Sequence, residues 1–343
     1  MSRPQPFAGH QAEPALEVRY APADSLPRQL ADPRVLAVFG FGDATAAHPD
    51  PRWLRVPLQP LRAAAPVVEV WRAGGPVDCG RDGEVAWASD GQLLFGALEI
   101  DEPEGDIEAA ARQAYARLGA FMAGCDTPHL LRIWNYMDAI TLGDDDEERY
   151  RRFCVGRVAG MAGVKTLDVA RLPAATAIGR CDGVRRLQVY WLAARAPGRP
   201  VENPRQVSAY RYPRQYGPQS PSFARAMLPP ADAAMPLLLS GTAAIVGHAS
   251  LHSGEVRAQV DETLANLDSL VAAARVQAPA LPAALGAGSL LKVYVRDHDD
   301  AEAIAARLAQ RLDRSVPCLL LHAQVCRREL LVEIDGVHGA PPL

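Results

Sequence analysis

The segments LLRIWNYM (Leu130–Met137) and LLKVYV (Leu290–Val295) decide the fold of this chain. Both are short runs of apolar, β-favouring residues, and such runs predict buried strands. The match between LLRIW and LLKVY favours an internal duplication over a coincidental similarity of two α/β stretches. The segments that flank each run repeat the same order of elements.

In the first half, the strand LLFGALEI (Leu93–Ile100) precedes the first of these runs. Apolar residues at helical spacing predict a helix between the two strands. They are Ile107, Ala110, Ala111, Ala114, Leu118 and Phe121. Glu147–Met161 is then predicted as a helix, and AATAIG (Ala174–Gly179) and RLQVYWLAA (Arg186–Ala194) as two strands.

The second half repeats this order, beginning with the strand TAAIVGHAS (Thr242–Ser250). Two helices are predicted on either side of LLKVYV from their apolar faces. The first face is Val260, Leu264, Leu267, Leu270 and Val271, and the second is Ala301, Ile304, Ala305, Leu308 and Leu312. PCLLLHAQV (Pro317–Val325) and ELLVEI (Glu329–Ile334) are predicted as the closing strands.

An order of strand, helix, strand, helix, strand, strand, used twice, predicts mixed sheets with helices packed on one face. We therefore expect an α/β (α+β) fold with two halves, residues 1–198 and residues 199–343. The second half opens with a Pro-, Arg- and Tyr-rich segment between Arg195 and Pro230 that has no clear periodicity. Long irregular segments in compact proteins are usually functional or disordered, and its aromatic content argues against disorder.

The 343 residues, 49% of them hydrophobic, suggest about two domains with sizeable cores. A net charge of −4 gives no electrostatic footprint for nucleic acid or for an anionic membrane. The sequence has no apolar run long enough to span a bilayer, and Met1–Tyr20 lacks the apolar centre of a signal peptide. We expect a cytoplasmic protein.

The cysteines and histidines do not predict a disulfide framework or a metal site. Six cysteines are scattered without a C-x-x-C pair, which is typical of reduced thiols. His248 and His252 have the spacing of helical metal ligands, but they fall in a segment predicted as strand and turn.

Two segments are candidates for binding an anion. Tyr150 and Arg157 are seven residues apart, so a helix places them on one face, where a phenol and a guanidinium can hold a carboxylate. From spacing alone, a solvated basic face is the simpler interpretation. Residues 203–226 alternate tyrosines with arginines across Pro and Gly turns, which suits a small, planar, doubly negative ligand. Single-stranded RNA could use such a surface, but the acidic net charge argues against it. A surface loop without a functional role is the other alternative.

Glu333 is the candidate general acid. It lies mid-strand among apolar residues, and strand alternation puts it on the face opposite to Val332 and Ile334. Burial raises the pKa of a carboxyl, as a general acid near neutral pH requires. An ordinary outward-facing Glu is the alternative. Cys326, taken alone, is more often a buried inert thiol than a catalytic one.

Several separated motifs carry a resemblance to known families. LLKVYVRD (Leu290–Asp297) together with VPCLLLHAQVCRRELLVEIDG (Val316–Gly336) resembles the RidA/YjgF fold. With SGTAAIVGHASLHSGE (Ser240–Glu255), SAYRYPRQYGPQSPSFARA (Ser208–Ala226) and RIWNYM (Arg132–Met137), almost the whole chain resembles the chorismatase family. RidA proteins are trimers with sites between subunits, and a chorismatase is similar to such an assembly within one chain. The resemblance implies tandem RidA/YjgF-like halves in a pseudo-trimeric arrangement.

The resemblance implies that the substrate is chorismate, an enolpyruvyl ether with two carboxylates. Glu333 would take part in protonating the methylene carbon of the enol ether, with loss of pyruvate and without a metal or organic cofactor. The residues expected to hold the carboxylates and the ring are Tyr150, Arg157, Tyr212, Tyr216 and Arg225. The resemblance does not specify an oligomer, so we expect a monomer or a weak homo-oligomer.

The family divides by product. Hydrolytic members add water and release a dihydroxycyclohexadiene carboxylate, whereas others form 3-hydroxybenzoate and some also form 4-hydroxybenzoate. Gly241 and Cys326 resemble the 3-hydroxybenzoate type. A RidA-like metabolite-binding protein without turnover is the alternative from another class. A RidA-like imine hydrolase is a third, but VPCLLLHA (Val316–Ala323) has no Arg where that family holds its substrate carboxylate.

Overall fold

The computed structural model describes residues 15–43, 45, 47–62, 65–162, 171–231 and 233–340. Most of the segment Met1–Tyr20, on which the expectation about a signal peptide rests, lies outside these residues. Within the described part of the chain, no helix has the length and apolar character needed to cross a membrane.

Three large sheets and one two-stranded hairpin make up the β-structure. The four-stranded sheet contains β1 (Leu16–Pro22), β5 (Val67–Ala73), β2 (Val35–Phe41) and β3 (Trp53–Val56). The six-stranded sheet contains β10 (Ala174–Arg180), β9 (His129–Asp138), β11 (Arg186–Ala194), β8 (Leu93–Asp101), β7 (Val85–Ser89) and β6 (Asp78–Asp82). The seven-stranded sheet contains β12 (Arg199–Val201), β13 (Ala226–Leu228), β14 (Leu237–Ala243), β19 (Val332–His338), β17 (Leu290–Val295), β18 (Cys318–His322) and β4 (Pro60–Leu61).

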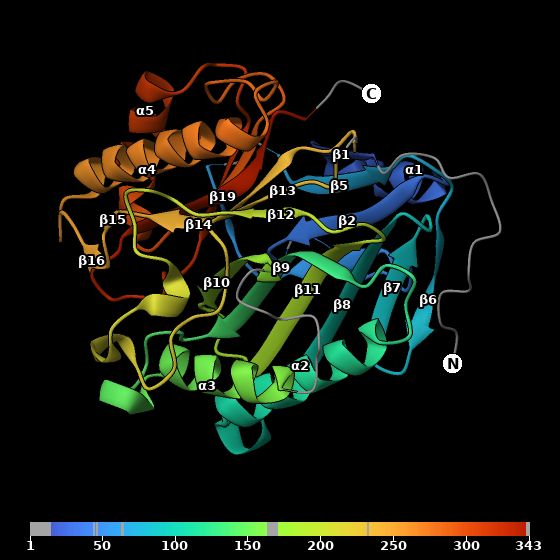
Figure 1. Cartoon of the computed structure of the whole chain (residues 1–343), viewed down its shortest axis with the longest axis horizontal. Helices are drawn as coiled ribbons and strands as arrows, with labels where there is room; N and C mark the ends of the chain where they lie inside the picture. The colour runs from blue at the N-terminus through green and yellow to red at the C-terminus, as the bar shows by residue number, and fades with distance from the viewer. Residues whose placement is uncertain are drawn as a thin grey trace.

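The α-helices of the described residues are few and amphipathic. The α-helices are α1 (Leu26–Ala31), α2 (Ile107–Met122), α3 (Arg149–Met161), α4 (Val256–Gln277) and α5 (Ala301–Arg311). Helix α2 begins at an N-cap, Asp106, whose carboxylate accepts from the backbone N–H groups of Glu108 and Ala109. In Figure 1, α2 and α3 lie together against the six-stranded sheet, and α4 and α5 lie together beyond the seven-stranded sheet.

The three large sheets share one four-strand core. Its order is β1-β5-β2-β3 in the first sheet, β8-β11-β9-β10 in the second and β14-β19-β17-β18 in the third. In each core the first two pairings are antiparallel and the last is parallel. The sequence predicts two copies of this unit. The third copy, at the N-terminus, has the run VLAVFGF in β2 where the others have LLRIWNY and LLKVYV.

Each of the two larger sheets separates two layers of core. On β9, Ile133 and Met137 pack against α2 and α3, whereas Trp134 and Tyr136 face a common centre between the sheets. Aromatic side chains from all three sheets meet there: Trp134 stacks on Tyr190 at a centroid distance of 4.8 Å, Trp71 lies 5.3 Å from Trp134, and the hydroxyl of Tyr294 is 3.1 Å from that of Tyr136. The expected α+β class with mixed sheets is confirmed.

Most of the predicted elements are found, with shifted bounds. Helix α3 begins at Arg149 rather than Glu147, because Glu148 has an extended backbone conformation. TAAIVGHAS is not one strand: β14 ends at Ala243, and β15 (Ile245–Val246) turns back into β16 (Ala249–Ser250) at Gly247, which has a φ of +60°. The prediction of a single strand is wrong at this turn, which needs the left-handed conformation that Gly adopts readily.

The closing strands also differ from the prediction. Strand β18 ends at His322 and β19 begins at Val332, so the residues between them form a loop that contains Cys326. The boundary expected between residues 198 and 199 stays a prediction. β12 begins there, but β4 of the first half pairs with β18 of the seven-stranded sheet.

Candidate active site

A cavity of about 470 Å³ lies between the six-stranded and seven-stranded sheets. Its walls come from α3, β10, β14 and β19, and from the Tyr- and Arg-rich segment before β13. All of the residues proposed from the sequence line it: Tyr150, Arg157, Tyr212, Tyr216, Arg225, Gly241, Cys326 and Glu333. Residues from distant parts of the chain therefore converge on one space of the size of a small-ligand site.

Arg157 lies on α3 with its guanidinium facing the cavity. The helix packs so closely on α2 that a Cβ at position 156, which is Gly, would lie 2.1 Å from the carbonyl oxygen of Glu108. Arg157 is only 4% exposed, and its guanidinium lies 5.1 Å from the Tyr115 ring. Its Nε and Nη2 atoms are buried and have no hydrogen-bond partner among the residues that the structure describes. Unpaired buried donors are costly, so they mark a place where an anion can bind.

Arg225 presents a second buried guanidinium. Its Nη2 donates to the carbonyl oxygen of Val207 at 3.0 Å and to the hydroxyl of Tyr212 at 2.8 Å, which fixes its orientation. Its Nε atom is buried, and no described residue forms a hydrogen bond with it. The side chain also lies over the ring of Phe223, at 5.1 Å. Two arginines, each with a free donor, can hold two carboxylates of one ligand.

Tyr216 and Arg327 form the wall at the Tyr-rich side of the cavity. The guanidinium of Arg327 lies 4.0 Å from the Tyr216 ring and 5.3 Å from the Tyr212 ring. The hydroxyl of Tyr216 is 3.1 Å from Nδ1 of His248. Stacked cations and aromatic rings give this wall a rigid, flat surface.

Glu333 lies on β19 and is 5% exposed. Val332 and Ile334 point into the core beneath α4 and α5, so alternation turns Glu333 towards the cavity, as predicted. Burial and then the nearby Asp335 raise the pKa of Glu333 to about 8, against the lowering effect of Arg132 and Arg225. Glu333 therefore carries a proton at neutral pH.

Gly241 on β14 makes room for this carboxyl. A Cβ at position 241 would lie 1.9 Å from Oε1 of Glu333. The backbone N–H of Gly241 donates to Oγ1 of Thr176 on β10 at 3.0 Å, which ties the two sheets together beside the acid. Any side chain here would have to displace Glu333.

The phenol and the thiol near Glu333 are both neutral. Burial raises the pKa of Tyr150 well above its usual range. Burial, with the adjacent Glu333 as the next cause, raises the pKa of Cys326 to about 12. A thiol in this state is a weak nucleophile but can give or accept a hydrogen bond.

Comparisons with known proteins agree with this geometry. A chorismatase of Streptomyces rapamycinicus is 39% identical over 276 residues, which are 78% of this chain and 81% of that protein. A 3-hydroxybenzoate synthase of Streptomyces hygroscopicus is 34% identical over 282 residues, or 80% and 82% of the two chains. The chain belongs to the chorismatase family.

A crystal structure of a chorismatase matches with a TM-score of 0.84 and 32% sequence identity, covering 96% of this chain and all of that one. The family model described as "Chorismatase FkbO/Hyg5-like, N-terminal" matches residues 69–193. The resemblance to chorismatases is confirmed, and the roles of the individual cavity residues stay predictions.

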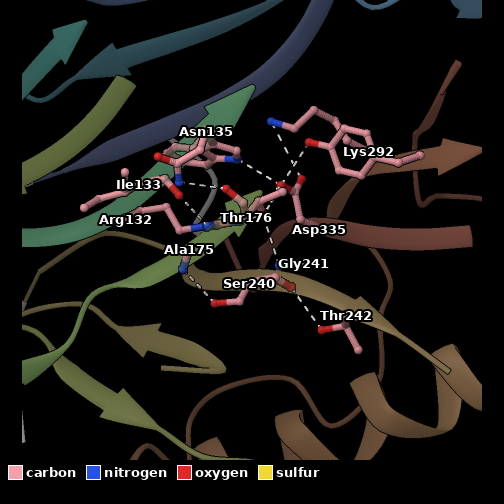
Figure 2. A network of polar contacts seen from close by, with 12 residues as sticks. Arg132, Ile133, Asn135, Ala175, Thr176, Ser240, Gly241, Thr242, Lys292 and Asp335 are labelled. Atoms are coloured by element: carbon pink, nitrogen blue, oxygen red, sulfur yellow. Dashed lines mark hydrogen bonds and ion pairs between the residues drawn. The ribbon is translucent and has the colours of Figure 1, made fainter. Parts of the chain in front are cut away.

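The polar groups behind the chorismatase cavity are not among the residues predicted from the sequence. Arg132, Thr176 and Asp335 are each at most 2% exposed and are linked by hydrogen bonds at the centre of the molecule (Figure 2). Lys292 joins them from β17. A charged residue inside each of the matched runs LLRIW and LLKVY was the available signal, since charges are buried only when paired.

The histidines considered as metal ligands have other partners. His248 lies beside Tyr216, and His252 is 3.1 Å from a carboxylate oxygen of Glu262. Among the residues that the structure describes, no group of three or more His, Cys, Asp or Glu side chains is placed to hold a metal ion.

Proposed function

We propose that this cavity converts chorismate into 3-hydroxybenzoate and pyruvate, with Glu333 as the acid that protonates the enolpyruvyl ether. The observation that carries the proposal is a buried carboxyl, with its pKa raised to about 8 by burial, that faces a cavity with two incompletely paired guanidinium groups. An acid of this kind can protonate a carbon, and the two cations match a dianionic substrate.

Arg157 and Arg225 would hold the two carboxylates, with the tyrosines as flat walls for the ring. Arg157 offers Nε and Nη2, which is the pair of donors used in bidentate binding of a carboxylate. Arg225 offers Nε, while Tyr212 keeps its guanidinium in place. Filling these donors removes the cost of leaving them unpaired, so the free-energy gain appears on binding.

The proposed reaction begins with proton transfer from Glu333 to the terminal methylene carbon, which becomes a methyl group. The ether oxygen then shares its electrons with the neighbouring carbon, giving an oxocarbenium-like centre. The ring carbon–oxygen bond breaks and that oxygen leaves as the keto oxygen of pyruvate. The adjacent ring hydroxyl takes its place, and its proton returns to the Glu333 carboxylate.

The ring product of this step is an arene oxide with the same atoms as a hydroxybenzoate, so no water is consumed. Opening one epoxide bond gives 3-hydroxybenzoate, and opening the other gives 4-hydroxybenzoate. The neutral thiol of Cys326 lines the cavity and can assist proton movement at the ring. The 3-hydroxybenzoate synthase relative supports the first product.

The alternative within the family is hydrolysis to a dihydroxycyclohexadiene carboxylate. Incubation of the purified chain with chorismate, with and without EDTA, separates the alternatives when products are identified by chromatography with mass detection. We expect equal amounts of pyruvate and hydroxybenzoate in both samples. A dihydrodiol would replace the proposed product, and unchanged chorismate would leave a metabolite-binding protein. Cytoplasmic location and a monomeric or weakly oligomeric state stay predictions.

Replacing Gly241→Ala should lower kcat by at least about tenfold, because a methyl group would displace the carboxyl that delivers the proton. Gly75→Ala is the matched control, since a Cβ at position 75 would meet Asp90 only at 3.8 Å. Turnover of both variants is measured with the pyruvate assay. Unchanged kcat in Gly241→Ala would show that this close approach does not matter for catalysis.

The pH profile gives a further prediction. Because Glu333 must be protonated, kcat/KM should fall about tenfold per pH unit above a limb near pH 8. In the free enzyme, Arg225 lowers the pKa of Glu333. A substrate carboxylate bound to Arg225 neutralises this effect, so the pKa of Glu333 rises and the limb in kcat should lie at a higher pH than the limb in kcat/KM. Both profiles come from initial rates across pH 6–10 (a range of about four units). A rate that rises through pH 8 would contradict an acid at this position.

A further inference from the structure

The buried network centres on Asp335, which lies two residues after Glu333 on β19. A single oxygen, Oδ2, accepts hydrogen bonds from side chains of three strands besides its own. The donors are Arg132 Nη2 at 3.1 Å, Trp134 Nε1 at 2.9 Å, Thr176 Oγ1 at 2.8 Å and Tyr294 OH at 3.0 Å. The other oxygen is 3.8 Å from the ammonium group of Lys292. Figure 2 shows this carboxylate between the two cations.

The repeated four-strand core provides an internal comparison for Glu333. β5 and β19 occupy the same place in their cores, each antiparallel to the strand that carries the repeated run. Glu333 pairs with Tyr294 of β17, and Glu69 pairs with Phe39, the corresponding aromatic of β2. Glu69 is therefore the counterpart of Glu333 in the first sheet.

The two acids differ in what the neighbouring sheet offers them. Glu69 is 2% exposed and accepts from Lys292 at 3.1 Å, so it is held as part of an ion pair. The counterpart of Lys292 in the six-stranded sheet is Arg132, at the same place in LLRIW and LLKVY.

Arg132 is turned to a different partner. It pairs with Asp335 and donates to Oγ1 of Thr176 at 2.5 Å. Among the described residues, no side chain forms an ion pair with Glu333, because Arg132 and Lys292 pair with Asp335 and Glu69.

We propose that Asp335 is a positioning residue that holds Arg132 away from Glu333 and so leaves the Glu333 carboxyl free to carry a proton. This inference rests on the proposed role of Glu333 as the acid. Arg132 forms its ion pair with Asp335, whereas Lys292, the equivalent cation, forms its ion pair with Glu69. Thr176 connects this arrangement to the cavity, because its hydroxyl accepts from Gly241 and donates to Asp335.

The charges around Glu333 agree with this role. The titratable groups that act on it or are acted on by it come from β19, β9, α3 and two loops: Asp335, Arg132, Tyr150, Cys326 and Arg225. Asp335 raises the pKa of Glu333, whereas Arg132 and Arg225 lower it. Removing the negative charge of Asp335 both deletes the raising influence and frees Arg132 to approach Glu333.

The test compares the basic limb of kcat/KM in two variants that change charge in opposite directions. We expect Asp335→Asn to move the limb down by at least about one pH unit, and Arg132→Met to move it up. In Asp335→Asn combined with Arg132→Met, the limb should return towards the wild-type position. A merely structural loss lowers the rate without moving the limb in opposite directions.

Tyr294→Phe is the matched control, because it removes one hydrogen bond to Asp335 and no charge. Its limb should stay in place even if its rate falls. The protonated Glu333 carbonyl band in infrared difference spectra, assigned by its loss in Glu333→Gln, gives a second readout that needs no turnover. A limb and a band that titrate at the same pH in wild type, Asp335→Asn and Arg132→Met would overturn the inference. If Asp335→Asn does not fold, an unchanged position of the basic limb of kcat/KM in Arg132→Met is sufficient to overturn the inference. Retained turnover in Glu333→Gln would instead overturn the proposed function, so the two failures are distinguishable.

Discussion

Glu333→Gln should abolish measurable pyruvate release from chorismate while the protein stays folded. General acid catalysis contributes about 10²–10⁴-fold to a rate, and an amide cannot donate the proton that the methylene carbon requires. Glu333 is only 5% exposed, but Gln is neutral, as is the protonated Glu333, so the buried site should accommodate Gln without unfolding. Pyruvate is measured by a coupled assay, and folding by circular dichroism and thermal unfolding.

Glu329→Gln provides the comparison, because Glu329 also lines the cavity but is not on β19. We expect this variant to keep its turnover within a few-fold of wild type. If Glu333→Gln retained wild-type kcat, another group would have to supply the proton, and the role assigned to Glu333 would be wrong.

The second large effect is expected from Arg157→Met. Hydrogen bonds to charged groups contribute about 1.5–3 kcal/mol each, so losing Nε and Nη2 should lower kcat/KM about 10²- to 10⁴-fold. The free protein should lose little stability, because these donors have no partner before the ligand binds. Steady-state kinetics measures kcat/KM, and thermal unfolding measures the stability.

The control on the same helix is Arg152→Met. Arg152 points to the surface and pairs with Glu147 at 2.7 Å, away from the cavity lining. We expect normal kinetics from this variant. A normal kcat/KM in Arg157→Met would mean that its buried guanidinium does not hold a substrate carboxylate.

The fold was predictable where the pattern of apolar residues was regular. The runs around Leu130 and Leu290, and the helices that flank them, follow directly from periodicity. The third copy of the core was not predicted, because the described residues between β2 and β3 form no helix and VLAVFGF has no charged residue to match Arg132 or Lys292. Its assignment depends on strand pairing, which a single sequence does not contain.

The cavity was predictable as a set of residues but not as an arrangement. Alternation along β19 turned Glu333 away from the helices, and helical spacing put Tyr150 and Arg157 together. The raised pKa of Glu333 depends on burial and on Asp335 and Arg132, which only the packing of two sheets brings near it. Such long-range contacts are not encoded in local periodicity.

The repetition of one four-strand core in a single chain has a consequence for how reactivity is distributed. In a symmetric homotrimer, every substitution is made three times, so all the clefts between subunits must carry the same groups. Here the equivalent acids are encoded separately: Glu69 is bound to Lys292, and Glu333 faces a cavity with no ion-pair partner among the described residues. The chain can thus keep one position as structural support and, under the proposed function, use its counterpart as the acid, whereas identical subunits cannot differ in this way.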